Sequence, residues 1–309
     1  MSYSGARFGY WFACLSLLLI AVSPLEVHAQ NKMHLLVSIK PLALIAQKVV
    51  GDEVDVATLL PVTASPHDYP LKMSDHKRLR AADLVLWIGP EMESFLARPL
   101  ANLPQNRVMS AYQLPGLYWP QAGKLDHQHH HQTHHSHKGK DPHIWLDPRN
   151  AALIAQALAE RLAQLKPESA DLFIHNAQAF SFAIQQLDEQ LRQQLTPVKE
   201  LGFAVYHEGY GHFVGRYGLH QVAYVTYMPE RRPGAKHLQE LRALMAKEGE
   251  CLFIEPFYKV NAMEEIATSL GLRVGLLDPI GDQGVSSYEQ LLQHLAQGFL
   301  TCLANGRNS

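Results

Sequence analysis

The 309-residue chain carries almost no net charge, since 27 basic and 29 acidic side chains give a formal charge of −2 at pH 7. It has no basic block of the kind that binds nucleic acid, so nothing indicates a nucleic-acid partner. It also lacks a glycine-rich phosphate loop ending in Gly-Lys-Ser/Thr and a Gly-x-Ser-x-Gly elbow. These absences disfavour nucleotide hydrolysis and serine-hydrolase chemistry.

Long apolar runs are scarce, and the clearest one is Tyr10–Val22 near the amino terminus. Arg7 precedes this run, and Val27-His28-Ala29 places small residues at −3 and −1 before Gln30, which is the pattern of a cleaved signal peptide. The run is shorter than the ~18 residues that span a bilayer. We therefore expect residues 1–29 to be removed and the mature chain to be exported as a soluble protein.

Cysteine is scarce as well. Once residues 1–29 are removed, only Cys251 and Cys302 remain. In an oxidising compartment, a lone pair of cysteines predicts one disulfide. A thiolate metal site is the alternative, but the two residues are far apart and neither belongs to a Cys-x-x-Cys motif.

Short apolar, β-branched segments alternate with amphipathic segments along most of the chain. This alternation is typical of parallel sheets covered by helices on both faces. The predicted strands are 35–39, 54–60 and 84–88 in the first half, then 203–206, 222–226, 251–255 and 274–277. The predicted helices are 42–50, 74–82 and 148–165 in the first half, then 209–218, 235–248, 261–270 and 287–303.

Residues 168–195 have a different pattern, with apolar side chains at the three- and four-residue spacing of one helical face. Pro167 and Pro197 flank this segment, where proline suits a helix boundary. A helix of this length would extend for about 40 Å. We predict an α/β protein with two lobes, residues 30–165 and 198–309, joined by a linker helix at 166–197. A surface helix of one large domain is the alternative.

The most concentrated feature is a histidine-rich stretch at residues 126–137, DHQHHHQTHHSH. Imidazole is the commonest side-chain ligand for transition metals, so this stretch predicts metal handling, with a low-complexity linker as the alternative. Residues 121–140 contain few apolar side chains, so we expect a mobile loop that binds metal weakly. The histidines concerned are His127, His129, His130, His131, His134, His135 and His137.

Four other histidines stand at predicted strand ends or in adjoining loops, where ligands gather in α/β proteins. They are His67, His143, His207 and His212. Three neutral imidazoles make a sound zinc site, with a fourth position for water or a carboxylate. A zinc-protease motif needs two histidines four residues apart on one helix, whereas His207 and His212 do not have that spacing.

Five segments carry a resemblance to a known family: SPHDYPLKMSDHKRLRAADLVLWIGPEMESFL, DPHIWLDP, YHEGYGHF, RPGAKHLQEL and LDPIG. They resemble the periplasmic zinc-binding components of bacterial zinc ABC importers (ZnuA-like proteins), within the metal-binding family of solute-binding proteins. The resemblance extends over essentially the whole mature chain, including the histidine-rich insertion and the two late cysteines.

This resemblance implies two Rossmann-like lobes with metal in the cleft between them, bound by His67, His143 and His207. Manganese-binding relatives carry glutamate at the position of His207, so histidine there favours zinc. Asp278 matches an aspartate that completes the site in those relatives; here it ligates, bridges through water, or holds His67 or His143 in place. His212 stands where many members carry an aromatic residue, and is either a fourth ligand or a ring in the cleft wall.

The function that the resemblance implies is capture of Zn²⁺ in the periplasm and delivery to the membrane permease of an ABC importer. Zinc is then the transported ligand, no enzymatic step occurs, and the chain is expected to act as a monomer. A manganese- or iron-binding protein of the same family is one alternative. A secreted zinc hydrolase is the alternative from a different class.

Overall fold

The computed structural model describes residues 1–2, 32–120, 140–231, 233–256 and 261–304. Most of the predicted signal peptide and all seven histidines of the histidine-rich stretch therefore lie outside the described residues. Lys32–Ser309 form one compact unit. Within the described part of the chain, no helix is both long and apolar enough to cross a membrane.

The first sheet contains four parallel strands in the order β2-β1-β3-β4. The central strand β3 is buried along its whole length and β1 along most of its length, whereas the edge strand β2 alternates between buried and accessible positions. This difference explains the continuous apolar runs of the central strands and the polar interruptions of VDVAT. The strands are β1 (Met33–Val37), β2 (Val54–Thr58), β3 (Leu84–Trp87) and β4 (Val108–Ser110).

The second sheet repeats this arrangement, with parallel strands in the order β6-β5-β7-β8. In each sheet the first and third strands of the lobe lie side by side at the centre. The carboxyl ends of these two strands flank the crevice where α/β proteins bind ligands. The strands are β5 (Gly202–His207), β6 (Gln221–Thr226), β7 (Gly249–Ile254) and β8 (Arg273–Leu276).

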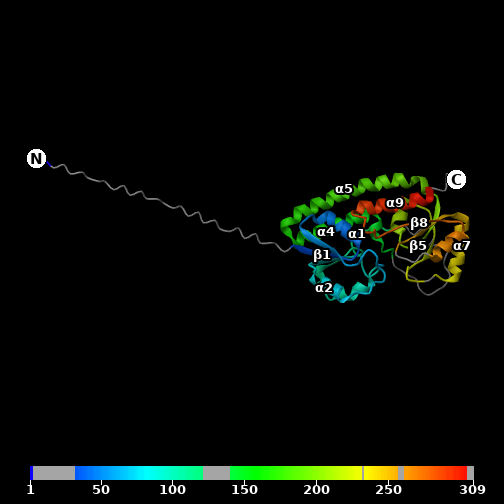
Figure 1. The fold of residues 1–309 in the computed structure, drawn as a ribbon, viewed down its shortest axis with the longest axis horizontal. Coiled ribbons are helices and arrows are strands. Elements are labelled where there is room, and N and C mark those ends of the chain that lie inside the picture. Colours follow the sequence, from blue (N-terminus) through cyan, green and yellow to red (C-terminus); the bar gives the residue numbers. More distant parts are fainter. Residues whose placement is uncertain (3–31, 121–139, 232, 257–260, 305–309) are drawn as a thin grey trace. The chain divides into compact units, whose positions relative to one another are not determined.

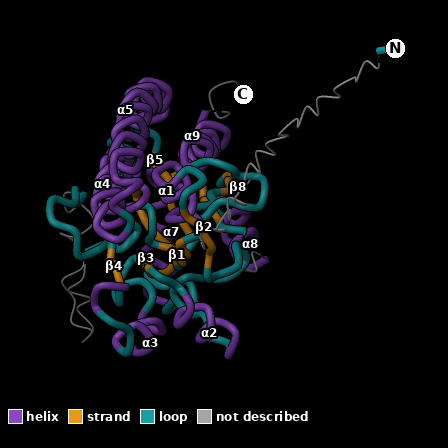
Figure 2. Tube along the Cα trace, turned by 90° about the vertical axis from the view of Figure 1, so that its left-hand side faces the viewer, coloured by secondary structure: helices purple, strands orange, loops and turns teal. Residues whose placement is uncertain are grey.

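Helices lie on both sides of the strands, as Figure 2 shows with α1, α4, α5 and α9 on one side and α2 and α3 on the other. The helices are α1 (Lys40–Val50), α2 (Met73–Ala81), α3 (Ala97–Ala101), α4 (Pro148–Leu165), α5 (Ala170–Leu195), α6 (Gly211–Tyr217), α7 (Ala235–Glu248), α8 (Asn261–Ser269) and α9 (Tyr288–Ala304). Short 3₁₀ turns are η1 (Ser94–Leu96), η2 (Gln105–Arg107), η4 (Ile144–Leu146), η5 (Pro167–Ser169) and η6 (Thr196–Val198).

The long helix predicted from the apolar spacing is present as α5, which has 26 residues. Its buried face consists of the apolar residues at the expected spacing together with Asp188, whose carboxylate binds the guanidinium of Arg216. The helix packs against α1 and α4 at one end and α9 at the other, and it runs along both lobes in Figure 1. The two-lobed α/β architecture with a long connecting helix is therefore confirmed.

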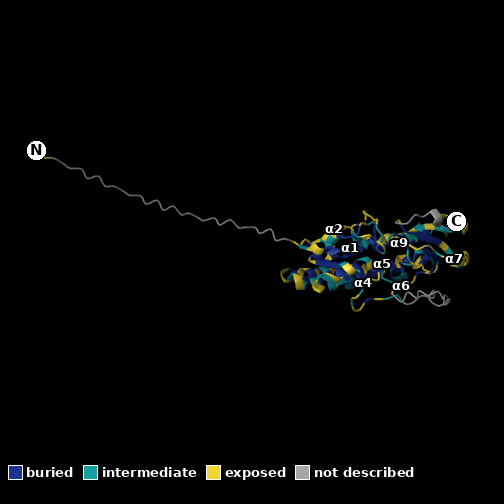
Figure 3. Ribbon diagram, turned by 90° about the horizontal axis from the view of Figure 1, so that it is seen from below, coloured by how far each residue is buried: buried dark blue, intermediate teal, exposed yellow. Residues whose placement is uncertain are grey.

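The two lobes share most of their hydrophobic core. One cluster of buried side chains extends from β1, α1 and β3 through α4 and α5 to α9, and a smaller cluster lies between α7 and its sheet. Buried residues accordingly continue through both lobes in Figure 3. Lys48 on α1 also forms an ion pair of 2.9 Å with Glu289 on α9. The lobes are thus docked through apolar contact on the side of α5.

The predicted disulfide is present and joins Cys251 to Cys302, with 6.2 Å between their Cα atoms. It ties α9 to β7, the strand that lies next to β5 in the middle of the second sheet. Phe299 on α9 packs against Phe203 and Phe253 on the same side of that sheet. The covalent link therefore reinforces a contact that aromatic packing already makes.

Candidate metal centre

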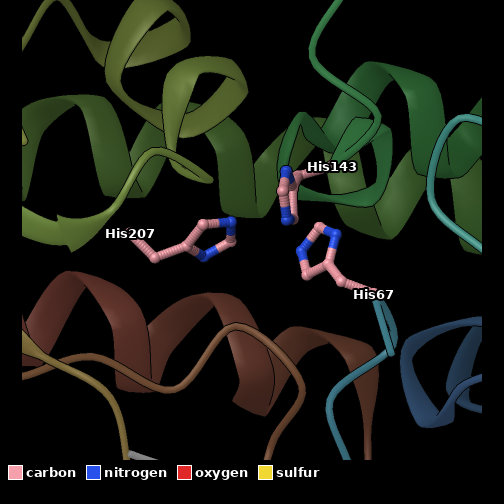
Figure 4. Close-up of side chains that lie close together, drawn as sticks. All are labelled: His67, His143 and His207. Atoms are coloured by element: carbon pink, nitrogen blue, oxygen red, sulfur yellow. The ribbon is translucent and has the colours of Figure 1, made fainter. Parts of the chain in front are cut away.

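Three histidines from three separate segments meet between the lobes. His67 lies in the loop between β2 and α2, His143 directly precedes η4, and His207 is the last residue of β5. Their ring centroids are 4.9–5.2 Å apart, and one nitrogen from each ring lies within 4.8 Å of the others. Figure 4 shows the three rings pointing toward one another.

The local structure fixes where each imidazole stands. His207 ends the central strand β5, at the carboxyl edge of the second sheet. His143 precedes a 3₁₀ turn that leads into α4, where Asp147 caps the helix by accepting a hydrogen bond from the backbone N–H of Arg149. Pro148 follows at the first helical position, where proline is well tolerated. His67 donates its backbone N–H to Ser65 Oγ at 3.2 Å.

Two of the three rings are oriented by carboxylates, those of half-buried Asp141 and of buried Glu255. The distance from His143 Nδ1 to Asp141 Oδ1 is 2.7 Å, and that from His207 Nδ1 to Glu255 Oε1 is 3.1 Å. A carboxylate can only accept, so each Nδ1 carries the proton and each Nε2 keeps its lone pair. Carboxylates bound to the outer nitrogen of a ligating histidine orient the ring and raise its basicity.

Buried nitrogens without hydrogen-bond partners mark the centre of the group. Among the described residues, Nε2 of His67 and Nε2 of His207 are buried and have no partner. Leaving a buried polar atom unsatisfied costs free energy, and a bound cation would remove that cost. The surrounding cavity is lined by Pro66, His67, His143, Trp145, His207, Glu255, Pro279 and Ile280.

The electrostatics favour neutral imidazoles at two of the three positions. Burial, and then the neighbouring imidazoles, hold the pKa of His67 well below its ordinary value. Burial also lowers the pKa of His143, despite the opposing effect of Asp141. For His207, burial acts to lower the pKa, but the charge and hydrogen bond of Glu255 outweigh burial and raise it. A histidine must be unprotonated to bind a metal ion. The lowered pKa values of His67 and His143 therefore favour binding of a metal cation over protonation of these rings.

A glycine lies against two of these rings. A Cβ added at Gly209 would stand 2.5 Å from His207 Cε1 and 2.9 Å from His143 Nε2. Real Cβ atoms do not approach other atoms so closely, so any larger residue would displace the imidazoles. Gly209, the first glycine in the segment YHEGYGHF, therefore leaves the space that the site needs.

Asp278 and His212, the two other predicted site residues, are not part of the three-histidine group. Asp278 Oδ1 accepts the backbone N–H groups of Ile280 and Gly281 at 3.0 and 2.9 Å, which shapes the turn that lines the cavity. Burial raises the pKa of Asp278. His212 is buried, with its ring centroid 5.6 Å from that of Trp119. This geometry favours a wall position for His212 over a ligand position.

The sequence prediction did not include Asp141 and Glu255. Asp141 stands two residues before His143, and the Asp-x-His spacing was the available signal. Glu255 follows β7, and its role depends on β7 lying beside β5. No local sequence pattern places these two strands together.

Two parallel α/β lobes around a histidine group define a two-lobed binding protein of the kind that holds a small ligand between its lobes. The chain matches the ZnuA family, described as zinc-uptake complex component A, periplasmic, over residues 35–302, and it belongs to that family.

Individual relatives agree with this assignment. The chain is 34% identical over 285 residues to the high-affinity zinc uptake system protein ZnuA of Yersinia pestis, covering 86% of this chain and 90% of that protein. The protein of the same name from Haemophilus ducreyi is 35% identical over 302 residues, covering 92% and 97%. A crystal structure of ZnuA superposes with a TM-score of 0.75 at 26% identity, covering 88% of this chain and 100% of that one.

Proposed function

We propose that the protein captures Zn²⁺ in the cleft between its lobes and delivers it to the permease of an ABC importer. The observation that carries the proposal is the convergence of three imidazoles, those of half-buried His67 and of buried His143 and His207, contributed by both lobes. Nitrogen ligands suit zinc, whereas manganese prefers more oxygen ligands. The names of the relatives, high-affinity zinc uptake system proteins, support the same ligand.

Within this proposal, Asp278 supports the site through the turn that carries Pro279 and Ile280, or completes the zinc coordination directly or through water. His212 stays in the cleft wall. The seven histidines of the stretch 126–137 form weak accessory sites. The lobes are residues 30–165 and 198–309, linked by 166–197.

The proposed transport cycle involves binding and release without covalent chemistry. Residues 1–29 direct export and are then removed, which leaves the mature chain in the periplasm, the location that the family description names. The chain then acts as a monomer that loads zinc, docks on the permease and releases the ion.

Metal analysis of protein purified without a tag, followed by chelator competition among Zn²⁺, Mn²⁺ and Fe²⁺, tests the choice of metal. Tighter binding of Mn²⁺ or Fe²⁺ than of Zn²⁺ would contradict it.

Single substitutions test the site. His67→Ala, His143→Ala and His207→Ala each remove a ligand, and we expect each to weaken zinc binding by orders of magnitude in chelator competition. Gly209→Ala should also weaken binding, because its methyl group would occupy the space between two ligands. Gly234→Ala is the matched control, since a Cβ there meets nothing within 4 Å. Wild-type affinity in the His143→Ala protein would contradict the ligand assignment.

A further inference from the structure

The chain segment that leads into His143 is held by contacts unrelated to the three ligand rings. Tyr112 donates its hydroxyl to the backbone carbonyl of Lys140 at 3.0 Å. The Lys140 ammonium lies 4.4 Å from the ring centroid of Trp119, in a cation–π contact. Trp119 in turn packs edge-on against Tyr112 with centroids 5.1 Å apart. The backbone just before Asp141 is therefore fixed to the first lobe.

His212 reaches the same segment from the second lobe. It lies in the first turn of α6, is 1% exposed, and its Nε2 is 3.0 Å from the backbone oxygen of Asp141. A carbonyl oxygen can only accept, so His212 Nε2 carries the proton. Its Nδ1 faces the side-chain amide of Asn150 at 3.4 Å. Both ring nitrogens of His212 are thus engaged with protein groups, the backbone carbonyl of Asp141 and the side-chain amide of Asn150.

Asn150 fixes this choice of tautomer. Its Oδ1 accepts the backbone N–H of Tyr118 at 2.7 Å, and its Nδ2 donates to the backbone oxygen of Tyr118 at 2.9 Å. The amide is therefore oriented, and it presents Nδ2 to His212 Nδ1. Since an amide nitrogen donates, His212 Nδ1 must accept, which agrees with a proton on Nε2.

Asp141 transmits this constraint to the ligand. Its Oδ1 accepts both the backbone N–H and the ring Nδ1–H of His143, at 3.0 and 2.7 Å. The backbone of the second lobe packs against the same carboxylate, since a Cβ added at Gly211 would stand 2.7 Å from Asp141 Oδ2. Asp141 therefore lies between the lobes, bound to His212 on one side and to His143 on the other.

We propose that His212 and Asp141 are positioning residues that set the orientation of His143 for zinc. This inference rests on the proposed function. The line of hydrogen bonds from Asn150 through His212 and Asp141 to His143 turns the lone pair of His143 Nε2 toward the other two ligands. Because His212 belongs to the second lobe and His143 to the first, docking of the lobes adds the His212 hydrogen bond to the contacts that already hold Asp141 within the first lobe.

The test compares substitutions that separate hydrogen bonding from packing. His212→Phe keeps a ring against Trp119 but removes both polar contacts, whereas His212→Gln keeps a side-chain N–H that can reach the Asp141 carbonyl. We expect His212→Phe to weaken zinc binding about 10- to 100-fold, the effect typical of removing groups that orient metal ligands. His212→Gln should restore most of the affinity. The ligand-field spectrum of bound Co²⁺ should shift in the Phe variant and return toward wild type in the Gln variant.

His237 provides a matched control outside the site. Its Nε2 is 2.9 Å from the backbone oxygen of Tyr224, and its ring packs on that tyrosine with centroids 5.2 Å apart. His237→Phe therefore removes an imidazole–carbonyl contact of the same kind. We expect it to bind zinc and Co²⁺ as the wild type does, even where the metal-free protein unfolds at a lower temperature.

Asp141→Ala is the second variant and removes the carboxylate itself. It should weaken zinc binding at least as much as His212→Phe, and it tests the proposal if the Phe variant does not fold. Wild-type zinc affinity in either folded variant would overturn the proposal, as would equal losses in His212→Phe and His237→Phe. Failure of the proposed function is distinct, because the wild-type protein itself would then not bind zinc tightly.

Discussion

The carboxylates of Asp141 and Glu93 show that the partner, rather than burial alone, decides how an acidic side chain ionises. Burial acts to raise the pKa of both Asp141 and Glu93. Beside the imidazole of His143, the pKa of Asp141 nevertheless lies well below its usual range. At Glu93, burial outweighs the lowering effect of the nearby Ser38 hydroxyl and of the backbone N–H groups of Ile88 and Gly89, which donate to Oε2, and raises the pKa to about 7.

The raised pKa of Glu93 predicts a pH dependence of stability. Between its ordinary value of 4.5 and about 7, the folded state binds a proton that the unfolded state does not. This contribution is therefore favourable at low pH and is lost as pH rises through that window, by about 3 kcal/mol in the free energy of unfolding. Glu93→Gln keeps an oxygen for Ile88 and Gly89 and should remove this loss.

Urea unfolding of the metal-free protein at pH 5 and pH 8 measures the effect. As pH rises from 5 to 8, the free energy of unfolding of Glu93→Gln should increase relative to that of the wild type. Glu91→Gln, at an exposed position in the same loop, is the control and should follow the wild-type pH dependence. Parallel curves for the wild type and Glu93→Gln would contradict the prediction.

Their places at predicted strand ends and in adjoining loops singled out four histidines, and the family resemblance implied that His67, His143 and His207 are the ligands among them. Their carboxylate partners are harder to predict, because a carboxylate becomes an imidazole partner only through the packing of distant elements. Glu255 contacts His207 because β5 and β7 are neighbours in the sheet. Similarly, His212 was predicted near the metal, but its hydrogen bond to Asp141 depends on how the lobes dock.

Most strands and helices follow directly from apolar periodicity, and their predicted positions are confirmed with shifts of a few residues. The exceptions are short. β4 has three residues of intermediate burial and α3 has five residues, so neither provides a periodic pattern long enough to detect. Without β4, the order of the first sheet could not be completed from the sequence. The matching order of the two sheets became visible only in the structure.

The disulfide between β7 and α9 predicts an effect on stability that is separate from zinc binding. Its cysteines are 51 residues apart in sequence, and a loop of this length corresponds to about 4 kcal/mol in the chain-entropy model. The substituted pair Cys251→Ala and Cys302→Ala should lower the free energy of unfolding by up to that amount. Zinc affinity should be retained, because Cys251 lies toward the amino end of β7 while Glu255 follows its carboxyl end.

Urea unfolding and chelator competition on the same samples separate the two effects. Wild-type protein unfolded under reducing conditions is the control, and its unfolding midpoint should move toward that of the double variant. A double variant as stable as the oxidised wild type would show that the disulfide contributes nothing beyond the aromatic packing around Phe299.

At the scale of the whole molecule, the contacts between the lobes differ in how easily they can open. Those near α5 and α9 belong to a shared hydrophobic core, and buried Trp145 adds a 2.8 Å hydrogen bond from its indole N–H to the backbone oxygen of Pro279. Ser65, two residues before His67, instead donates to Glu230 at 2.6 Å in an exposed contact across the cleft. Opening this contact would disturb no apolar core.

The Ser65–Glu230 contact should therefore slow zinc release. Glu230→Ala removes the acceptor and leaves Ser65 Oγ available to the backbone N–H of His67, so the ligand loop keeps its own support. Loss of one such hydrogen bond predicts zinc dissociation about fivefold faster. Glu230→Gln retains an acceptor oxygen and should release zinc nearly as slowly as the wild type. Stopped-flow mixing of the zinc-loaded protein with excess chromophoric chelator measures these rates.

A charge-matched substitution distinguishes a closing contact from a general electrostatic effect. Glu250 is paired with Arg273 at 3.2 Å within the second lobe, so Glu250→Ala changes the net charge by the same amount without touching the cleft. If zinc dissociation accelerates equally in Glu230→Ala and Glu250→Ala, the lost charge is responsible, and the Ser65–Glu230 hydrogen bond does not hold the cleft closed. Acceleration confined to Glu230→Ala, with recovery in Glu230→Gln, would locate the opening motion at the loops that carry Ser65 and Glu230, opposite a core that stays closed.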